Sequence, residues 1–353
     1  MDDSTRAFLT DLLETPSPAG FEAAGQRRWT EYVAAFADEV RTDAYGNAVA
    51  VREGDPDAPA VALAGHADEI GLIVRSIDDD GFVRPGGIGG IDPTVARGQR
   101  VTIHADDGPV EGVVGRTAIH LREGDDDAPE VADLWIDVGA ADGEDARERV
   151  AVGDPITFSG GVSWLTETRL AGRGLDNRVG TWAAAEGLRR AAERDASATV
   201  YAVSTVQEEV GRQGAKMVGF DLDPDAVVAV DVGHALDYPT APRGKASDVE
   251  LGAGPAVGRG STNHPVVCRA VREAAADAGI EVQVEALGTG TGTDADAFFT
   301  AAGAIPSQVI SVPTRYMHTP VEVIDVGDLE ATAELLAAFA AVADEHEPFA
   351  VDV

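Results

Sequence analysis

Two patterns of apolar and polar positions divide this chain of 353 residues. Residues 1–69 and 165–353 alternate short apolar runs with alanine-rich segments of helical period, as in residues 178–194 and 327–345. Strands that alternate with helices in this way are typical of a sheet covered by helices. The two segments are therefore predicted to form one α/β domain.

A different pattern fills residues 70–164. Short β-like runs at residues 71–77, 100–104, 134–138 and 154–158 are separated by Gly, Asp and Pro, without a long helical period. This pattern predicts a small β domain inserted into the α/β domain. Its glycine-dense stretch RPGGIGGIDP lacks the GK[ST] ending of a phosphate-binding loop and is therefore predicted to be a turn.

Four apolar runs of the α/β part each lead into a polar cluster. The runs and their clusters are residues 61–64 with His66 and Asp68, residues 201–206 with Glu208 and Glu209, residues 227–230 with Asp231, and residues 309–312 with His318. In open α/β sheets, ligands bind just beyond the carboxyl ends of the strands. The four clusters are therefore expected to meet at one rim of the sheet.

A fifth candidate lies in the stretch RGLDNRVGTW, where Asp176 or Asn177 precedes a helical segment. Taken alone, either residue would be interpreted as a helix cap. Because four other polar clusters are expected to form one site, Asp176 is a candidate ligand as well.

The candidate side chains share imidazole and carboxylate chemistry without a thiolate: His66, Asp68, Asp176, Glu208, Glu209, Asp231 and His318. Such donors suit zinc, cobalt or manganese in a hydrolytic site. Three ligand carboxylates and one hydroxide would neutralise two divalent ions, which favours a two-metal site because a neutral cluster costs less to bury. Neighbouring side chains at a strand end point in opposite directions, so Glu208 and Glu209 are expected to have different roles.

The balance of charge argues against two classes of partner. With 27 basic and 62 acidic side chains the net charge is −35, which repels nucleic acid and anionic membrane surfaces. An acidic N-terminus and the lack of a long apolar run predict a soluble, cytoplasmic protein. Acidic residues spread along the whole chain, with Lys216 and Lys245 as its two lysines, predict a halophilic source. The lone Cys268 is expected to pack in the core.

Seven motifs follow one another along the chain: GHADEIG, GLDNRVG, QEEVGRQGA, DVGHALDYP, LGAGP, TGTDADAFF and VPTRYMHTPVEVID. Their order, together with the insertion, resembles the tetrahedral (TET), glutamyl-aminopeptidase-like family of di-metal aminopeptidases over about residues 16 to 335. The resemblance implies a three-layer α/β/α catalytic domain of the zinc-peptidase type with an inserted β-barrel-like domain. It also implies an enzyme that removes N-terminal residues from short peptides.

The resemblance further implies a place for each metal ligand. Asp176 would bridge two divalent ions. Zinc is the first candidate for these ions, and cobalt and manganese are alternatives. His66 and Asp231 would complete one site, and Glu209 and His318 would complete the other.

Two more carboxylates have implied roles. Asp68 would accept the proton on the free nitrogen of His66 and so fix the tautomer of that ligand. Glu208 would take a proton from the attacking water and deliver it to the leaving amine.

Two residues are left open by the motifs. Relatives often show Gly-Gly-Thr-Asp-Ala where this chain carries an extra acid at Asp296, which we interpret as a solvated surface residue. His234 follows Asp231 and either supports the site or is an ordinary histidine at its rim.

The resemblance also implies a homo-oligomer, in which residues 70–164 mediate dimerisation and the dimers assemble into a hollow tetrahedral dodecamer. The alternatives to an aminopeptidase are a related di-metal hydrolase of N-acyl amino acids or C-terminal peptide bonds, an endoglucanase, and a metal-binding scaffold. A glycosidase needs paired carboxylates but no histidines in metal-ligand motifs. A scaffold needs no second glutamate beside a ligand, so Glu208 argues for catalysis.

Overall fold

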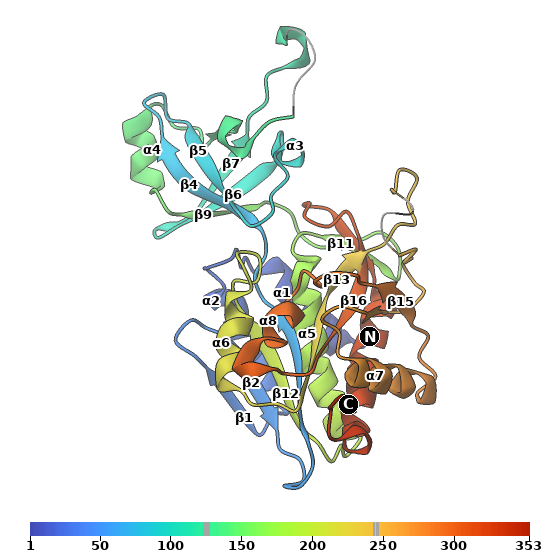
Figure 1. Ribbon diagram of the computed structural model, residues 1–353. Helices are drawn as coiled ribbons and strands as arrows, with labels where there is room; N and C mark the ends of the chain where they lie inside the picture. The colour runs from blue at the N-terminus through green and yellow to red at the C-terminus, as the bar shows by residue number, and fades with distance from the viewer. Residues whose placement is uncertain (123–127, 243, 245–246) are drawn as a thin grey trace.

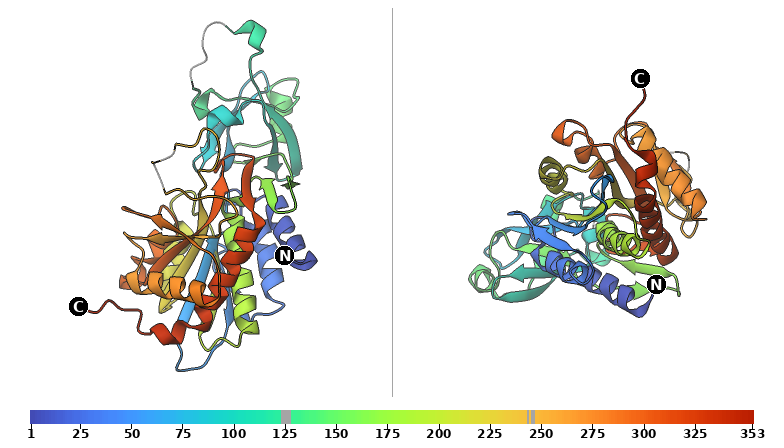
Figure 2. Two further views of the ribbon diagram at one scale, coloured as in Figure 1. Left: turned by 90° about the vertical axis from the view of Figure 1, so that its right-hand side faces the viewer. Right: turned by 90° about the horizontal axis from the view of Figure 1, so that it is seen from below.

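The computed structural model describes residues 1–122, 128–242, 244 and 247–353. The acidic run at residues 125–127 and Lys245 lie outside the described residues. Within these described residues, the strands belong to two sheets, a large one of 11 strands and a smaller one that closes into a barrel. Figure 1 shows the barrel separated from the large sheet, and the left view of Figure 2 shows it projecting from one end of the α/β body.

The main path of the large sheet has nine strands, in the spatial order β1 (Glu39–Thr42), β2 (Ala48–Arg52), β12 (Thr199–Thr205), β3 (Ala60–His66), β13 (Ala226–His234), β16 (Ser307–Arg315), β17 (Glu322–Asp325), β11 (Arg169–Gly172) and β10 (Ser163–Trp164). Two more strands extend it from β16, namely β14 (Ala256–Arg259) and β15 (Gln283–Ala286). The neighbours β12, β3, β13 and β16 are parallel, so their carboxyl ends lie at one rim. The expectation that the four polar clusters share a rim is confirmed.

Helices cover both faces of this sheet, because successive strand residues point to opposite sides. On β3, Val61 and Leu63 belong to the core that contains α1 (Asp3–Glu14), α2 (Ala23–Val33), α5 (Leu175–Glu193), α7 (Pro265–Asp277) and α9 (Val326–Ala341). Ala62 and Ala64 belong to the opposite core, with α6 (Gln213–Asp221) and α8 (Ala295–Phe298). Cys268 is buried on α7, as expected. The α/β fold predicted from the alternating pattern is confirmed.

The barrel contains β4 (Gly71–Ile77), β5 (Val83–Ile88), β8 (Ile136–Asp137), β7 (Gly108–Val114), β6 (Arg100–Ala105) and β9 (Pro155–Phe158), in that order around the barrel. Its side chains, such as Leu72, Val101, Ile136 and Ile156, form a core separate from those of the large sheet.

Two sequence expectations for this segment need correction. The run at 134–138 pairs only over the two residues of β8. The α-helices of its described residues are short, α3 (Pro93–Ala96) and α4 (Gly143–Arg149), in keeping with the absence of a long helical period. The glycine-dense stretch is not a simple turn, because its first half lies in β5. Glycines lower the strand propensity of this stretch, so its sequence does not predict a strand. The stretch nevertheless forms β5 because the neighbouring barrel strands β4 and β8 pair with it. Among the described residues, no helix has the length and apolar character needed to cross a membrane.

Candidate metal centre

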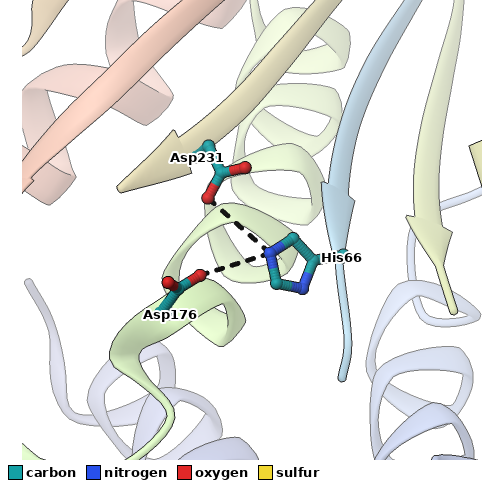
Figure 3. A group of neighbouring side chains, drawn as sticks. All are labelled: His66, Asp176 and Asp231. Atoms are coloured by element: carbon teal, nitrogen blue, oxygen red, sulfur yellow. Dashed lines mark ion pairs between the residues drawn. The ribbon is translucent and has the colours of Figure 1, made fainter. Parts of the chain in front are cut away.

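The first group of ligand-type side chains comes from three elements of the α/β domain. His66 is the last residue of β3, Asp231 lies within β13, and Asp176 lies at the start of α5. Nε2 of His66 is 3.2 Å from Oδ1 of Asp176 and 3.6 Å from Oδ1 of Asp231, as drawn in Figure 3. All three residues are buried. One imidazole nitrogen and two carboxylate oxygens thus point at a common position.

A second group shares Asp176 with the first. Nε2 of His318 is 3.4 Å from Oδ2 of Asp176 and 3.6 Å from Oε1 of Glu209. In each group the ligand-type atoms all lie within 4.8 Å of one another. The two oxygens of Asp176 therefore face different histidines, which is the arrangement expected of a carboxylate shared between two cations.

Glu322 holds the shared aspartate in place from behind. Its Oε2 accepts a hydrogen bond from the backbone N–H of Asp176 at 3.1 Å, and its Oε1 accepts one from the backbone N–H of His318 at 2.9 Å.

The sequence left open whether Asp176 or Asn177 caps the helix. Asn177 does so, because its Oδ1 accepts a hydrogen bond from the backbone N–H of Gly180 at 2.9 Å. Because Asn177 makes the capping hydrogen bond, the carboxylate of Asp176 can face His66 and His318.

Backbone carbonyls orient both imidazole rings. Nδ1 of His66 lies 3.1 Å from the carbonyl oxygen of Asp68 and 3.4 Å from its carboxylate. Nδ1 of His318 lies 3.0 Å from the carbonyl oxygen of Gly90. A carbonyl can only accept, so each Nδ1 carries the hydrogen and each Nε2 keeps its lone pair for a cation.

The carboxylate of Asp68, which lies 3.4 Å from Nδ1 of His66, has a further set of contacts. It accepts the backbone N–H groups of Glu208 at 2.9 Å and of Glu209 at 3.0 Å. It therefore connects the loop after β12 to the end of β3. Glu208 and Glu209 both line a cavity of about 540 Å³ that also contains His66 and His318.

Burial and mutual repulsion dominate the titration of this cluster. Burial raises the pKa of Glu208 to about 9, helped by the charge of Asp231, and it raises the pKa of Glu209 to about 8, helped by Asp176. Burial alone would lower the pKa of His66, but Asp231 and Asp176 together hold it well above its usual value. Closely packed acids of this kind call for added positive charge.

The residues fit divalent cations by three criteria. The donors are nitrogen and oxygen atoms of the kinds that zinc, cobalt and manganese accept. They converge in two groups, His66, Asp176 and Asp231 on one side, and Asp176, Glu209 and His318 on the other. In addition, Oε1 of Glu209 is buried without a hydrogen-bond partner among the described residues, which a cation beside it would satisfy.

Two contributors were missed by the sequence reasoning. Glu322 lies four residues after His318 in a motif already noted, but nothing local marks it as a support for the site. Gly90 belongs to the glycine-dense stretch of the barrel segment. A Cβ at Gly90 would lie 2.7 Å from the His318 ring, so a residue without a side chain allows this close approach.

The interpretation of Asp296 as a solvated surface acid is wrong. Its carboxylate accepts hydrogen bonds from Thr262, from Thr291 and from the backbone of Gly292, and it pairs with Arg212 at 2.8 Å. His234 is exposed at the cavity rim, one of the two positions that the sequence allowed.

A mixed α/β sheet whose parallel centre carries two adjoining nitrogen–oxygen ligand groups, with a further glutamate in the same cavity, defines a metallohydrolase. The family model described as M42 glutamyl aminopeptidase matches residues 46–335. The chain belongs to this family of metal-dependent aminopeptidases.

Individual relatives agree with this assignment. The chain is 35% identical to a lysyl aminopeptidase of Pyrococcus furiosus over 334 residues, which cover 93% of this chain and 94% of the relative. The crystal structure of a TET aminopeptidase from a marine sediment archaeon of the Thaumarchaeota superposes with a TM-score of 0.93 at 31% identity, covering 99% and 100% of the two chains. The TET1 peptidase of Pyrococcus horikoshii, which can assemble into a tetrahedron or a large octahedral shell, superposes with a TM-score of 0.84 at 31% identity and covers 95% and 99%.

Proposed function

We propose that this protein removes N-terminal residues from short peptides with two divalent cations at the shared site. One cation would be held by His66, Asp176 and Asp231, and the other by Asp176, Glu209 and His318. The observation that carries the proposal is the position of Asp176, whose two oxygens face the two histidines. Zinc is the first candidate for the metal, with cobalt and manganese as alternatives because the same donors suit all three.

The cations would lower the pKa of the attacking water, polarise the scissile carbonyl and stabilise the charge that develops on its oxygen. The chain supplies the proton transfers. Glu208 is buried in the cavity and, among the described residues, no group is hydrogen-bonded to its carboxylate. Bound cations would lower the raised pKa of Glu208, so that its carboxylate could accept a proton from the attacking water and deliver that proton to the leaving amine. Asp68 fixes the loop that carries it.

The test is hydrolysis of free and N-acetylated aminoacyl substrates in molar KCl, before and after chelation and after zinc, cobalt or manganese is restored. We expect cleavage of the free-amine substrates alone, lost with the chelator and recovered with metal. Cleavage of the acetylated substrates instead would identify an N-acyl amino acid hydrolase. Chelator-resistant cleavage of β-glucan would identify a glycosidase. The matched relatives are named for different residues, lysyl and glutamyl, so membership of the family does not determine the preferred N-terminal residue.

We further propose a homo-oligomeric assembly, in which residues 70–164 form the dimer contact and dimers assemble into a dodecamer. Support comes from the TET1 peptidase of Pyrococcus horikoshii and from two exposed apolar side chains of this segment. Ile119 and Leu121 are 70% and 76% exposed on a short helical turn. Exposed apolar side chains that cluster on one segment are typical of association surfaces.

The acidic surface is, in our proposal, an adaptation to molar salt in a halophilic cytoplasm. A net charge of −35 repels itself at low ionic strength, and salt screens this repulsion. The buried, unpaired Cys268 is compatible with a reducing compartment. We expect the melting temperature to rise as KCl is raised from millimolar to molar concentrations. A melting temperature that falls or stays constant over this range would contradict the proposal.

A further inference from the structure

One wall of the active-site cavity carries a carboxylate that the proposed chemistry does not use. Glu285 lies on β15, the outer strand of the branch in which β14 pairs with β16 and β15 pairs with β14. Glu285 lines the same cavity as the metal ligands. Among the described residues, none is hydrogen-bonded to or ion-paired with this carboxylate. Burial raises its pKa, and the nearby His234 opposes that shift. A partly desolvated carboxylate without a partner is suited to bind a cation.

The position of Glu285 relative to the metal ligands matches the length of a basic side chain. Oε2 of Glu285 lies 3.8 Å from where a Cβ on Gly233 would be. Gly233 is two residues beyond Asp231 on β13, so the two positions share a strand face and lie roughly 7 Å apart. In a substrate, the α-amino nitrogen is bonded to the Cα next to the scissile carbonyl and must stay beside the metal ligands. The side-chain nitrogen of lysine is five bonds farther, roughly 6 Å from Cα.

Gly233 allows β13 to pack closely against β16 in the same wall. A Cβ on Gly233 would approach Cβ of Ser311 to 2.7 Å, closer than real Cβ atoms come. Next to Glu285 the cavity is therefore lined by Ser311 and by the backbone of Gly233. Leu287, two residues after Glu285, lines the cavity beside it and offers apolar surface to the methylene groups of a long side chain.

The positive charge in the cavity wall does not compete for this role. Arg212 lines the cavity, but its Nη1 is paired with Oδ2 of Asp296 at 2.8 Å. Asp296 also accepts hydrogen bonds from Thr262 and Thr291, so the pair is held on both sides. Because Arg212 is already neutralised, the wall does not favour an acidic side chain.

We propose that Glu285 determines specificity by pairing with the side-chain ammonium or guanidinium of an N-terminal lysine or arginine. The inference rests on the proposed aminopeptidase function and names the substrate class for that site. Ion pairs are stronger in a partly water-excluded cavity than in water. A site built around a polar partner also discriminates strongly against an analogue that lacks it.

The experiment compares charged side chains with uncharged ones of similar length. The metal-loaded enzyme is assayed at one fixed KCl concentration with aminoacyl p-nitroanilides of lysine and norleucine, and of arginine and citrulline. Wild type is compared with Glu285→Gln and with Glu281→Gln, a control that neutralises an exposed glutamate just before β15. We expect Glu285→Gln to lower kcat/KM for lysine and arginine about tenfold or more, with norleucine and citrulline changed less than about twofold. Glu281→Gln should leave all four values unchanged.

Each other outcome has a definite meaning. An equal loss on all four substrates would place Glu285 at the α-amino group or in the structure of the wall, and an unchanged lysine-to-norleucine ratio would remove it from recognition; either result overturns the inference. Glu285→Lys gives a second readout, because charge reversal should abolish the preference for lysine while metal content and assembly are retained. If wild type cleaved none of the substrates with any metal, the aminopeptidase function itself would fail. Cleavage of norleucine but not lysine by wild type would overturn the inference alone.

Discussion

The backbone N–H of Glu208 donates to the carboxylate of Asp68 at 2.9 Å. The next N–H, that of Glu209, donates to the other oxygen of the same carboxylate at 3.0 Å. One buried aspartate thus fixes two adjacent glutamates relative to His66. The side chain of Glu209 meets His318 and Asp176, whereas that of Glu208 is left in the cavity. The different surroundings of the two glutamates lead to different predictions for the same substitution.

Glu208→Gln should retain both metal ions and lose turnover by about 10²–10⁴-fold, because an amide keeps the shape of the side chain but cannot accept the proton. Metal content by mass spectrometry and kcat on a free aminoacyl substrate measure the two effects. Loss of metal in this variant would place Glu208 among the ligands and contradict the proposed division of roles.

Glu209→Gln and Asp176→Asn should lose metal first and activity with it. An amide oxygen is a weaker donor to a divalent cation than a carboxylate, and Asp176 belongs to both ligand groups. Titration with zinc should show one site weakened in Glu209→Gln and both weakened in Asp176→Asn. Undiminished binding of two ions by either variant would refute the ligand assignment. Glu208→Gln is the matched control, since the same change one residue earlier should leave binding intact.

Glu69→Gln should destabilise the fold by about 3–5 kcal/mol, the usual result of leaving a buried charge without its partner. Glu69 is buried and pairs with both Arg173 and Arg178, of which Arg178 is also fully buried. Urea unfolding measures the loss. Asp145→Asn, which removes the exposed pair with Arg149, is the control and should cause no measurable change.

The same cluster predicts a pH dependence. Burial would raise the pKa of Glu69, but Arg173 and Arg178 outweigh burial and lower it from 4.5 to about 2. A carboxylate with a lowered folded-state pKa stabilises the fold above its unfolded-state pKa. This contribution is therefore complete above about pH 4.5 and is lost as the pH falls towards about 2. The difference in unfolding free energy between wild type and Glu69→Gln should shrink over that interval; a constant difference would show that Glu69 is not the titrating group.

Leu121→Ser combined with Ile119→Ser should reduce the size of the assembly, because both exposed apolar side chains lie on one turn of the barrel segment. Light scattering at fixed KCl measures the mass. Phe220→Ser on α6 is the control, since it removes an equally exposed apolar side chain from the α/β domain. A smaller assembly with Phe220→Ser and an unchanged one with the double variant would move the contact away from the barrel.

Many of the candidate site residues could be predicted from the residues next to them in the sequence. Apolar runs that lead into His66, Asp68, Asp231 or the Glu208–Glu209 pair predict buried strands with polar side chains at their carboxyl ends, because central strands of a parallel sheet are apolar and ligands bind beyond their carboxyl ends. Helix period and alanine content likewise identify α5 and α9, the latter ending at Ala341 before a short turn. These features depend on neighbouring residues, so a single sequence carries them.

The remaining features depend on residues far apart in the chain, and only the tertiary structure decides them. Gly90 and His318 are separated by 228 residues, and their contact exists because the barrel segment reaches across to the rim of the large sheet. Asp296 and Glu285 are both acids in polar stretches, yet Arg212 neutralises the first and no described residue neutralises the second. Their sequence surroundings do not distinguish them, because charge pairing is set by packing across the fold rather than by the order of residues along the chain.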